Sequence, residues 1–287
     1  MAWQTSRFLI DLSKPKVMGI VNVTPDSFSD GGRYQTVTAA LRHCERLILD
    51  GADILDLGGE SSRPGSVPVP LAEELARVLP LVREAVKLGV PLSVDSYKPQ
   101  VMQAVLDLGA DIVNDIWALR QGGANDAGSA LQVVSRHTGC GVCLMHMHGE
   151  PLTMQLSPMQ GDVVTQVRQF FASRVKALRD LDVAADRIVI DPGIGFGKTV
   201  AQNFALLAGQ HTLLELGYPL LAGWSRKSSL AAICGNSLGS VATLDARERL
   251  VPSVTAALLA VERGASIVRV HDVAETVQAL KVLAAIR

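Results

Sequence analysis

Residues 187–208 read RIVIDPGIGFGKTVAQNFALLA, and this stretch shows the repeating unit of the fold. Its first five residues form a β-branched run that predicts a short buried strand. A glycine-rich segment follows, and residues 200–208 have the apolar spacing of a helix. The stretch therefore predicts a strand, a turn and a helix, with Asp191 at the carboxyl end of the strand.

The same alternation recurs along the whole chain of 287 residues, and we count eight such units. The predicted strands are Val17–Asn22, Asp53–Leu57, Leu92–Asp95, Ile112–Asn114, Gly141–His146, Arg187–Asp191, Pro219–Gly223 and Ser266–His271. The predicted helices are 37–49, 71–88, 99–108, 127–137, 162–180, 200–208, 246–262 and 273–285. Eight consecutive units predict an α/β fold, a (β/α)8 TIM barrel, with a doubly wound open sheet as the alternative.

No linker or shift in composition divides the sequence, so residues 1–287 are interpreted as a single domain. The segment Phe8–Leu12 alternates apolar and polar residues and is expected to form a hairpin with the first strand, closing the bottom of the barrel. The first and second strand-to-helix loops are long and rich in Gly, Pro and Ser. In barrel enzymes such loops lie at the face that carries the chemistry.

Charge and composition exclude several classes of protein. With 27 basic and 28 acidic residues the formal net charge is −1, which gives no basic excess for nucleic acid or for a membrane surface. No apolar run reaches the roughly 18 residues of a membrane span, and the sequence lacks a signal-peptide pattern, so a cytoplasmic location is expected. Cys140 and Cys143 are spaced C-x-x-C without a second pair, which favours core packing over zinc.

Polar residues follow almost every predicted strand. Because the carboxyl ends of barrel strands meet at one mouth, these side chains are expected to converge there. They are Asn22, Asp95, Asn114, Asp191, Lys227, Arg269 and His271. Any one of them could simply cap the following helix, which is the role we expect for Asp115, but the whole set indicates a functional site.

The types of residue at this mouth indicate the kind of substrate. The acceptors and the amide of Asp95, Asn114 and Asp191 suit a neutral heterocycle with N–H donors. Arg269, His271 and Arg63 supply donors and positive charge for a phosphate. Asn22, with Asp26 and Asp30 in the first long loop, offers the oxygen ligands that Mg²⁺ takes beside a diphosphate.

Two other motifs are set aside on their spacing. The segment 193–199 has three residues between Gly193 and Gly197 where a P-loop has four, so it is interpreted as a tight turn. His146 and His148 are spaced as in some zinc barrels, but the first predicted strand contains no His. A hydrogen-bonded polar role is therefore expected for His146.

Taken together, these segments resemble those of the bacterial dihydropteroate synthases. The matching segments are MGIVNVTPDSFSDGG from Met18, GGESSRPG from Gly58, SVD from Ser93, NDI from Asn114, DPGIGFGK from Asp191, SRKS from Ser225 and RVHD from Arg269. They span all eight predicted units. The resemblance implies the condensation of 7,8-dihydropterin-6-ylmethyl diphosphate with 4-aminobenzoate in folate biosynthesis, with Mg²⁺ as cofactor and a homodimer as the assembly.

The resemblance also implies roles for individual residues. The pterin would be held by Asp95, Asn114, Asp191 and Lys227, the diphosphate by Arg269 and His271 with Ser62 and Arg63 closing over it, the aminobenzoate by Phe196, Pro64 and Ser228, and the metal by Asn22. Lys227, Arg63 and Asp30 are the predicted catalytic residues. Ser62 and Ser96 stand where the family pattern has Thr, which bears on inhibitor sensitivity and not on the reaction.

Two rival functions remain at this point. A related pterin-binding barrel transfers a methyl group from methyltetrahydrofolate to a corrinoid protein, but it binds no diphosphate. Arg63, Arg269 and His271 argue against it. A catalytically silent barrel that serves in assembly would have lost Arg63, Lys227 or Arg269, and all three are present.

Overall fold

A computed structural model describes residues 1–23, 33–63, 65–123, 126, 128–235, 244–245 and 248–286 of the chain. The barrel strands are β3 (Lys16–Asn22), β4 (Ile54–Gly58), β5 (Leu92–Asp95), β6 (Ile112–Asp115), β7 (Gly141–Met145), β8 (Ile188–Asp191), β9 (Leu221–Ala222) and β10 (Ile267–Val270). Each predicted strand is found, although β9 is shorter than expected.

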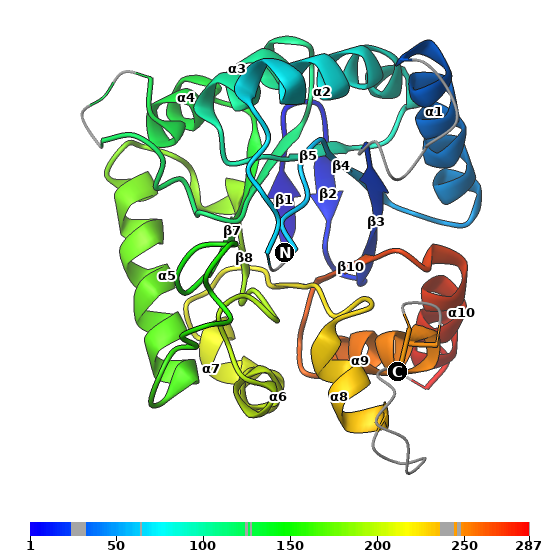
Figure 1. The fold of residues 1–287 in the computed structure, drawn as a ribbon, viewed down its shortest axis with the longest axis vertical. Coiled ribbons are helices and arrows are strands. Elements are labelled where there is room, and N and C mark those ends of the chain that lie inside the picture. The colour runs from blue at the N-terminus through cyan, green and yellow to red at the C-terminus, as the bar shows by residue number, and fades with distance from the viewer. Residues whose placement is uncertain are drawn as a thin grey trace.

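The strands form one parallel sheet in the order β8-β7-β6-β5-β4-β3-β10-β9. A parallel bridge between Ile190 and Leu220 joins the two ends of this order, and Ile190 N donates to Pro219 O at 3.0 Å. The sheet therefore curls into the predicted (β/α)8 barrel, and the alternative of an open sheet is wrong. Figure 1 shows the helices arranged around the strands.

The helices that follow the strands are α1 (Arg33–Leu49), α2 (Leu71–Ala85), α3 (Pro99–Asp107), α4 (Ala130–Arg136), α5 (Val163–Arg179), α6 (Val200–Ala208), α9 (Leu250–Glu262) and α10 (Val273–Ala284). Helix α2 buries Val78, Leu81 and Val82 on one side, where they join a core cluster with barrel-strand residues such as Leu57 and Val94. Two short helices, α7 (Gln210–Leu214) and α8 (Ser228–Cys234), were not predicted.

A separate two-stranded hairpin at the N-terminal end of the chain closes the bottom of the barrel. Strand β1 (Ala2–Gln4) pairs antiparallel with β2 (Leu9–Asp11), so the partner of β2 is β1 and the prediction that it pairs with the first barrel strand is wrong. The Trp3 side chain is fully buried, and its Nε1 donates to Arg187 O at 2.9 Å. Trp3 and Ile10 pack with residues of seven barrel strands, so the predicted closure of the bottom is confirmed.

Candidate active site

A cavity of about 730 Å³ lies at the carboxyl ends of the barrel strands. Its lining includes every described residue that the sequence analysis assigned to substrates, metal or catalysis: Asn22, Ser62, Arg63, Asp95, Asn114, Asp191, Phe196, Lys227, Ser228, Arg269 and His271. The other two, Asp30 and Pro64, lie outside the described residues, as does Asp26. The expected convergence of the strand ends on one mouth is thus confirmed.

Three acceptor side chains form one end of this cavity, which we call the acceptor floor: Asp95, Asn114 and Asp191. Asn114 and Asp191 are 5% and 6% exposed, so these groups are largely withdrawn from water. Burial raises the pKa of Asp95 to about 7 against the opposing effect of Arg269, and burial also raises the pKa of Asp191. Gly193 N donates to Asp191 Oδ1 at 2.8 Å and fixes that carboxyl group.

Beneath the acceptor floor lies a carboxylate that the sequence analysis missed. Asp56 stands in the middle of β4 with no exposed surface, and its Oδ2 accepts from Arg269 Nε at 2.6 Å and from Asn114 Nδ2 at 3.1 Å. Arg269 Nη2 donates to Asp95 Oδ2 at 2.9 Å. The Arg269 guanidinium therefore lies among the floor carboxylates, a contact set that its predicted role at the diphosphate did not include.

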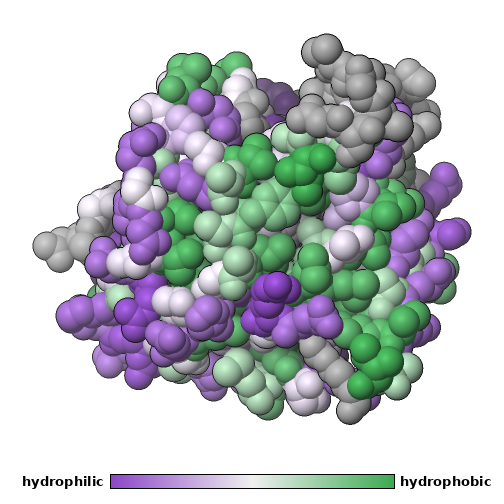
Figure 2. All heavy atoms as spheres, turned by 90° about the horizontal axis from the view of Figure 1, so that it is seen from below, coloured by the Kyte–Doolittle hydropathy of each residue, from purple (hydrophilic) through white to green (hydrophobic). Residues whose placement is uncertain are grey.

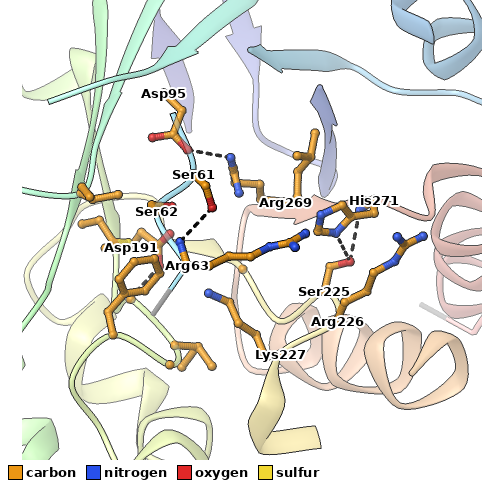
Figure 3. A pocket seen from close by; sticks show the side chains of 18 of the residues that line it. Ser61, Ser62, Arg63, Asp95, Asp191, Ser225, Arg226, Lys227, Arg269 and His271 are labelled. Atoms are coloured by element: carbon orange, nitrogen blue, oxygen red, sulfur yellow. Dashed lines mark hydrogen bonds and ion pairs between the residues drawn. The ribbon is translucent and has the colours of Figure 1, made fainter. Parts of the chain in front are cut away.

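The opposite end of the cavity carries cationic and hydroxyl groups, which we call the cationic mouth: Arg63, Lys227, His271 and Ser225. In Figure 3 the Arg63 side chain extends across the cavity toward His271, and Lys227 points into the same space. His271 Nδ1 lies 2.9 Å from Ser225 Oγ. This end presents donors to whatever occupies the cavity.

Burial disfavours the protonated, charged forms of two of these side chains, Lys227 and His271. It lowers the pKa of Lys227 to about 8 despite the nearby Asp191 carboxylate. Burial together with the cations Arg226, Arg269, Arg63 and Lys227 lowers the pKa of His271 to about 3. Several positive groups thus crowd the same region, an environment that a bound phosphate group would stabilise.

Three sets of tertiary interactions fix the turn that precedes Lys227. Arg226 adopts a left-handed φ of 57°, an uncommon conformation for a residue with a side chain. Its N–H donates to Ser253 Oγ at 2.9 Å, its carbonyl accepts from Arg249 Nη1 at 3.0 Å, and its guanidinium pairs with Asp272 at 2.5 Å. These bonds hold the backbone that aims Lys227 into the cavity.

The glycine-rich segment after β8 is a tight turn, as predicted, and not a P-loop. Gly193 has a φ of 66°, and a Cβ there would lie 2.0 Å from the His146 carbonyl oxygen. The Lys198 side chain, 2% exposed, donates to the carbonyls of His146, Gly193 and Phe196. Lys198 therefore fastens the turn and is not available to a phosphate, while the turn presents the Phe196 ring, which lies 4.4 Å from Lys227 Nζ.

Two further predictions concern residues near the site. The His146 ring is 6% exposed and packs edge-on against Phe170, with no hydrogen-bond partner for Nδ1 within the described parts of the chain. The expected hydrogen-bonded role of His146 is thus not supported at Nδ1, and the ring makes an aromatic contact with Phe170. Cys140 and Cys143 are fully buried free thiols, as their predicted core packing requires.

The second strand-to-helix loop is anchored at its start and exposed further on. Lys98 Nζ pairs with both Glu60 and Glu74, and Tyr97 Oη donates to Glu60 Oε1 at 3.2 Å. Arg63, a few residues later, is exposed. Glu60 was missed by the sequence analysis because its partner Lys98 lies 38 positions away in the chain.

Known proteins resemble this chain over nearly its whole length. The sequence pattern of the family described as "Pterin binding enzyme" matches residues 18–271. The chain is 48% identical over 285 residues to a dihydropteroate synthase from Neisseria meningitidis serogroup B, covering 98% of this chain and 95% of that protein.

Solved structures are similar over the same extent. The crystal structure of Burkholderia cenocepacia dihydropteroate synthase complexed with 7,8-dihydropteroate matches with a TM-score of 0.87 and 52% identity, covering 100% of this chain and 96% of that one. A Xanthomonas albilineans dihydropteroate synthase with 4-aminobenzoic acid matches with a TM-score of 0.86 and 47% identity, covering 97% and 95%.

Proposed function

The chain belongs to the pterin-binding enzymes, in the dihydropteroate synthase family, and from that premise we propose how its cavity carries out the reaction. The reaction joins 7,8-dihydropterin-6-ylmethyl diphosphate to 4-aminobenzoate and gives 7,8-dihydropteroate and diphosphate. What is proposed is the assignment of the two ends of the cavity to the two ends of the pterin substrate.

One observation carries the assignment: Asp95 and Asp191 of the acceptor floor and His271 of the cationic mouth lie on different sides of a single cavity (Figure 3), with Lys227 near Asp191. A dihydropterin offers ring N–H donors, which suit the carboxyl groups of Asp95 and Asp191 and the side chain of Asn114. The diphosphate on its methylene arm then extends toward Arg63 and His271, while Lys227, near the Asp191 carboxylate, reaches the pterin. The 4-aminobenzoate lies at the rim beside Phe196 and Ser228, next to the methylene carbon.

The donor set fits Mg²⁺ bound together with the substrate. Magnesium in phosphate sites takes one or two protein oxygens and completes its shell with phosphate oxygens and water. Asn22 supplies an amide oxygen at the end of β3, and it lines the cavity. No group of three or more His, Cys, Asp or Glu that could hold a metal by itself occurs in the parts of the chain described. When bound, Mg²⁺ would neutralise charge on the diphosphate.

We expect carbon–oxygen cleavage to run ahead of attack by the amine. The dihydropterin ring can share positive charge at the methylene carbon, and the nearby carboxyl groups of Asp95 and Asp191 stabilise that charge. Arg63 and His271 meet the negative charge that develops on the departing diphosphate. The weakly basic aryl amine then attacks the methylene carbon and releases a proton to the departing diphosphate or to solvent, and no protein nucleophile is needed.

A turnover assay tests the function, and isotopes test the mechanism. Purified protein, Mg²⁺, the pterin diphosphate and labelled 4-aminobenzoate are expected to give labelled dihydropteroate. Deuterium at the methylene carbon should give a normal secondary isotope effect on kcat/KM. An effect near unity would contradict early cleavage, and no labelled product would contradict the function.

A homodimer is the proposed assembly, supported by an apolar surface. Figure 2 shows hydrophobic residues gathered on the face seen from below in the orientation of Figure 1. Among the exposed large hydrophobic residues are Ile233 in α8, Val251 in α9 and Val282 in α10, at 49%, 72% and 70% exposed. Sedimentation of the wild-type protein and of Val251→Asp tests this: a monomeric wild-type protein would contradict it.

The proposed location is the cytoplasm. The four cysteines are all free thiols, which suits a reducing compartment. Within the described ranges, none of the helices combines the length and the apolar character needed to cross a membrane. Fractionation of cells that express the protein tests the proposal.

A further inference from the structure

Asp56 occupies a position where a carboxylate is costly. It lies within the apolar strand β4, between Leu55 and Leu57, and has no exposed surface. A buried carboxylate must recover its lost hydration from partners, and a well-packed apolar residue is often no less stable in such a place. The stability of the barrel alone therefore does not explain why an acidic residue occupies this position.

The bonds of Asp56 all converge on one oxygen. Oδ2 accepts from both Arg269 Nε and Asn114 Nδ2, while Oδ1 has no hydrogen-bond partner within the described residues. Arg269 and Asn114 both line the cavity, whereas Asp56 does not. One buried oxygen thus ties together two residues of the substrate site that come from different strands, β10 and β6.

The second bond of the guanidinium extends this arrangement to the acceptor floor. Arg269 Nη2 donates to Asp95 Oδ2, so Asp56, Arg269 and Asp95 form a continuous chain across three strands. An Arg269 side chain released from Asp56 could rotate away from Asp95. The position of two floor residues therefore depends on a residue that the substrate does not touch.

We infer that Asp56 is a positioning residue for the pterin ring, holding Asn114 directly and Asp95 through Arg269. The inference rests on the proposed function, because it names the ring end of the cavity as the pterin site. Asp56 is expected to act on ring affinity and to leave the 4-aminobenzoate site beside Phe196 and Ser228 unaffected. No atom of Asp56 takes part in the chemical step.

A graded pair of substitutions tests this. Asp56→Asn keeps a neutral oxygen that can accept from Arg269, and Asp56→Ala removes both oxygens. We expect the Kd for 6-hydroxymethylpterin, which lacks diphosphate, to rise by roughly tenfold in Asp56→Asn and by about 100-fold in Asp56→Ala. The KM for 4-aminobenzoate at saturating pterin diphosphate should stay within about twofold of the wild-type value.

Asp115→Asn is the matched control. Asp115 is equally buried and lies in a barrel strand, but its oxygens accept from the backbone N–H groups of Trp117 and Leu119 and from no residue of the cavity. It should lose thermal stability without a change in pterin affinity. Calorimetry is performed on variants whose circular dichroism spectra match the wild type.

The outcomes separate the possibilities. Unchanged pterin affinity in both folded Asp56 variants, or equal losses for pterin and 4-aminobenzoate, would overturn the positioning role. If Asp56→Ala fails to fold, the comparison of pterin affinity between Asp56→Asn and Asp115→Asn is sufficient to test the positioning role. Pterin calorimetry needs no turnover, so failure of the proposed reaction would appear separately, as wild-type protein that binds pterin and forms no product.

Discussion

The acceptor floor and the cationic mouth face each other across one cavity, but they differ in how far they are built before a ligand arrives. In the floor, Asp95 already accepts a hydrogen bond from Arg269, and Asn114 and Arg269 both donate to the fully buried Asp56. In the mouth, Arg63 is exposed and the pKa of His271 is lowered to about 3, since burial and its cationic neighbours disfavour its protonated form.

This difference indicates where each end obtains its specificity. A preformed set of acceptors selects a ring by the pattern of its donors, and it loses little conformational entropy on binding. The exposed Arg63 guanidinium, in contrast, gains a counter-charge when an anion binds. Under the proposed assignment, the floor would recognise the pterin, and the mouth would gain its final electrostatic balance from the diphosphate.

The largest expected effect comes from removing a floor acceptor. Asp191→Ala should raise the activation barrier for kcat/KM by about 2 to 4 kcal/mol, or roughly 30- to 1000-fold, because a ring donor loses its buried partner. Steady-state kinetics measures this directly. A variant whose kcat/KM stays within threefold of the wild-type value would show that Asp191 does not contact the substrate, and the floor would then not be the end that recognises the ring.

Removing the exposed cation should have a smaller and more selective effect. Arg63→Ala is expected to weaken binding of the pterin diphosphate by about 10- to 100-fold and to leave the free pterin alcohol unchanged, because that ligand brings no charge. Arg83→Ala, at an exposed position in α2, is the control for loss of a surface charge. Equal losses for both ligands in calorimetry would show that Arg63 belongs with the floor.

The order of binding sharpens the comparison further. If the mouth is completed by diphosphate, then 4-aminobenzoate should bind negligibly to the empty protein and on the order of tenfold or more tightly once Mg²⁺ and diphosphate are present. The coupling is reciprocal, so 4-aminobenzoate should also slow the release of diphosphate. Titration with and without diphosphate measures it, and equal affinities would mean that the amine site is preformed.

The smallest expected effect is on pH dependence. An anion favours protonated His271, so diphosphate binding should raise the pKa of His271 above its starting value of about 3 and take up protons at pH 6. Affinity for diphosphate should then fall as pH rises from 5.5 to 7, by less than about tenfold per pH unit. His271→Asn should flatten this slope. An unchanged slope in that variant would assign the proton uptake to another group.

Much of the floor could be predicted because barrel geometry turns a linear pattern into a spatial one. Asp95, Asn114 and Asp191 each stand at the end of an apolar run, and parallel strand ends must meet. Asp56 escaped notice because it interrupts an apolar strand in its middle, and its main partner lies 213 positions later. Periodicity identifies a face but does not identify a partner at that distance.

Other differences have equally local causes. The hairpin partner of β2 was misassigned because Ala2–Gln4 is only three residues long and carries a single large apolar side chain, Trp3. Helix α8 was missed because its seven residues are too few to show a helical period. The left-handed Arg226 is set by tertiary bonds to Ser253, Arg249 and Asp272, which no local preference of arginine indicates.

The plug that Trp3 forms at the base of the barrel has a consequence for biosynthesis. Its hydrogen-bond acceptor, the carbonyl of Arg187, lies 184 residues downstream, and its packing partners include Val189, Leu221 and Ile267. A ribosome releases the hairpin first and these partners last, so the indole has no complete binding place until translation is nearly finished. The Trp3 indole therefore gains its final packing partners only late in synthesis, so the base of the barrel is completed after most of its strands have been made.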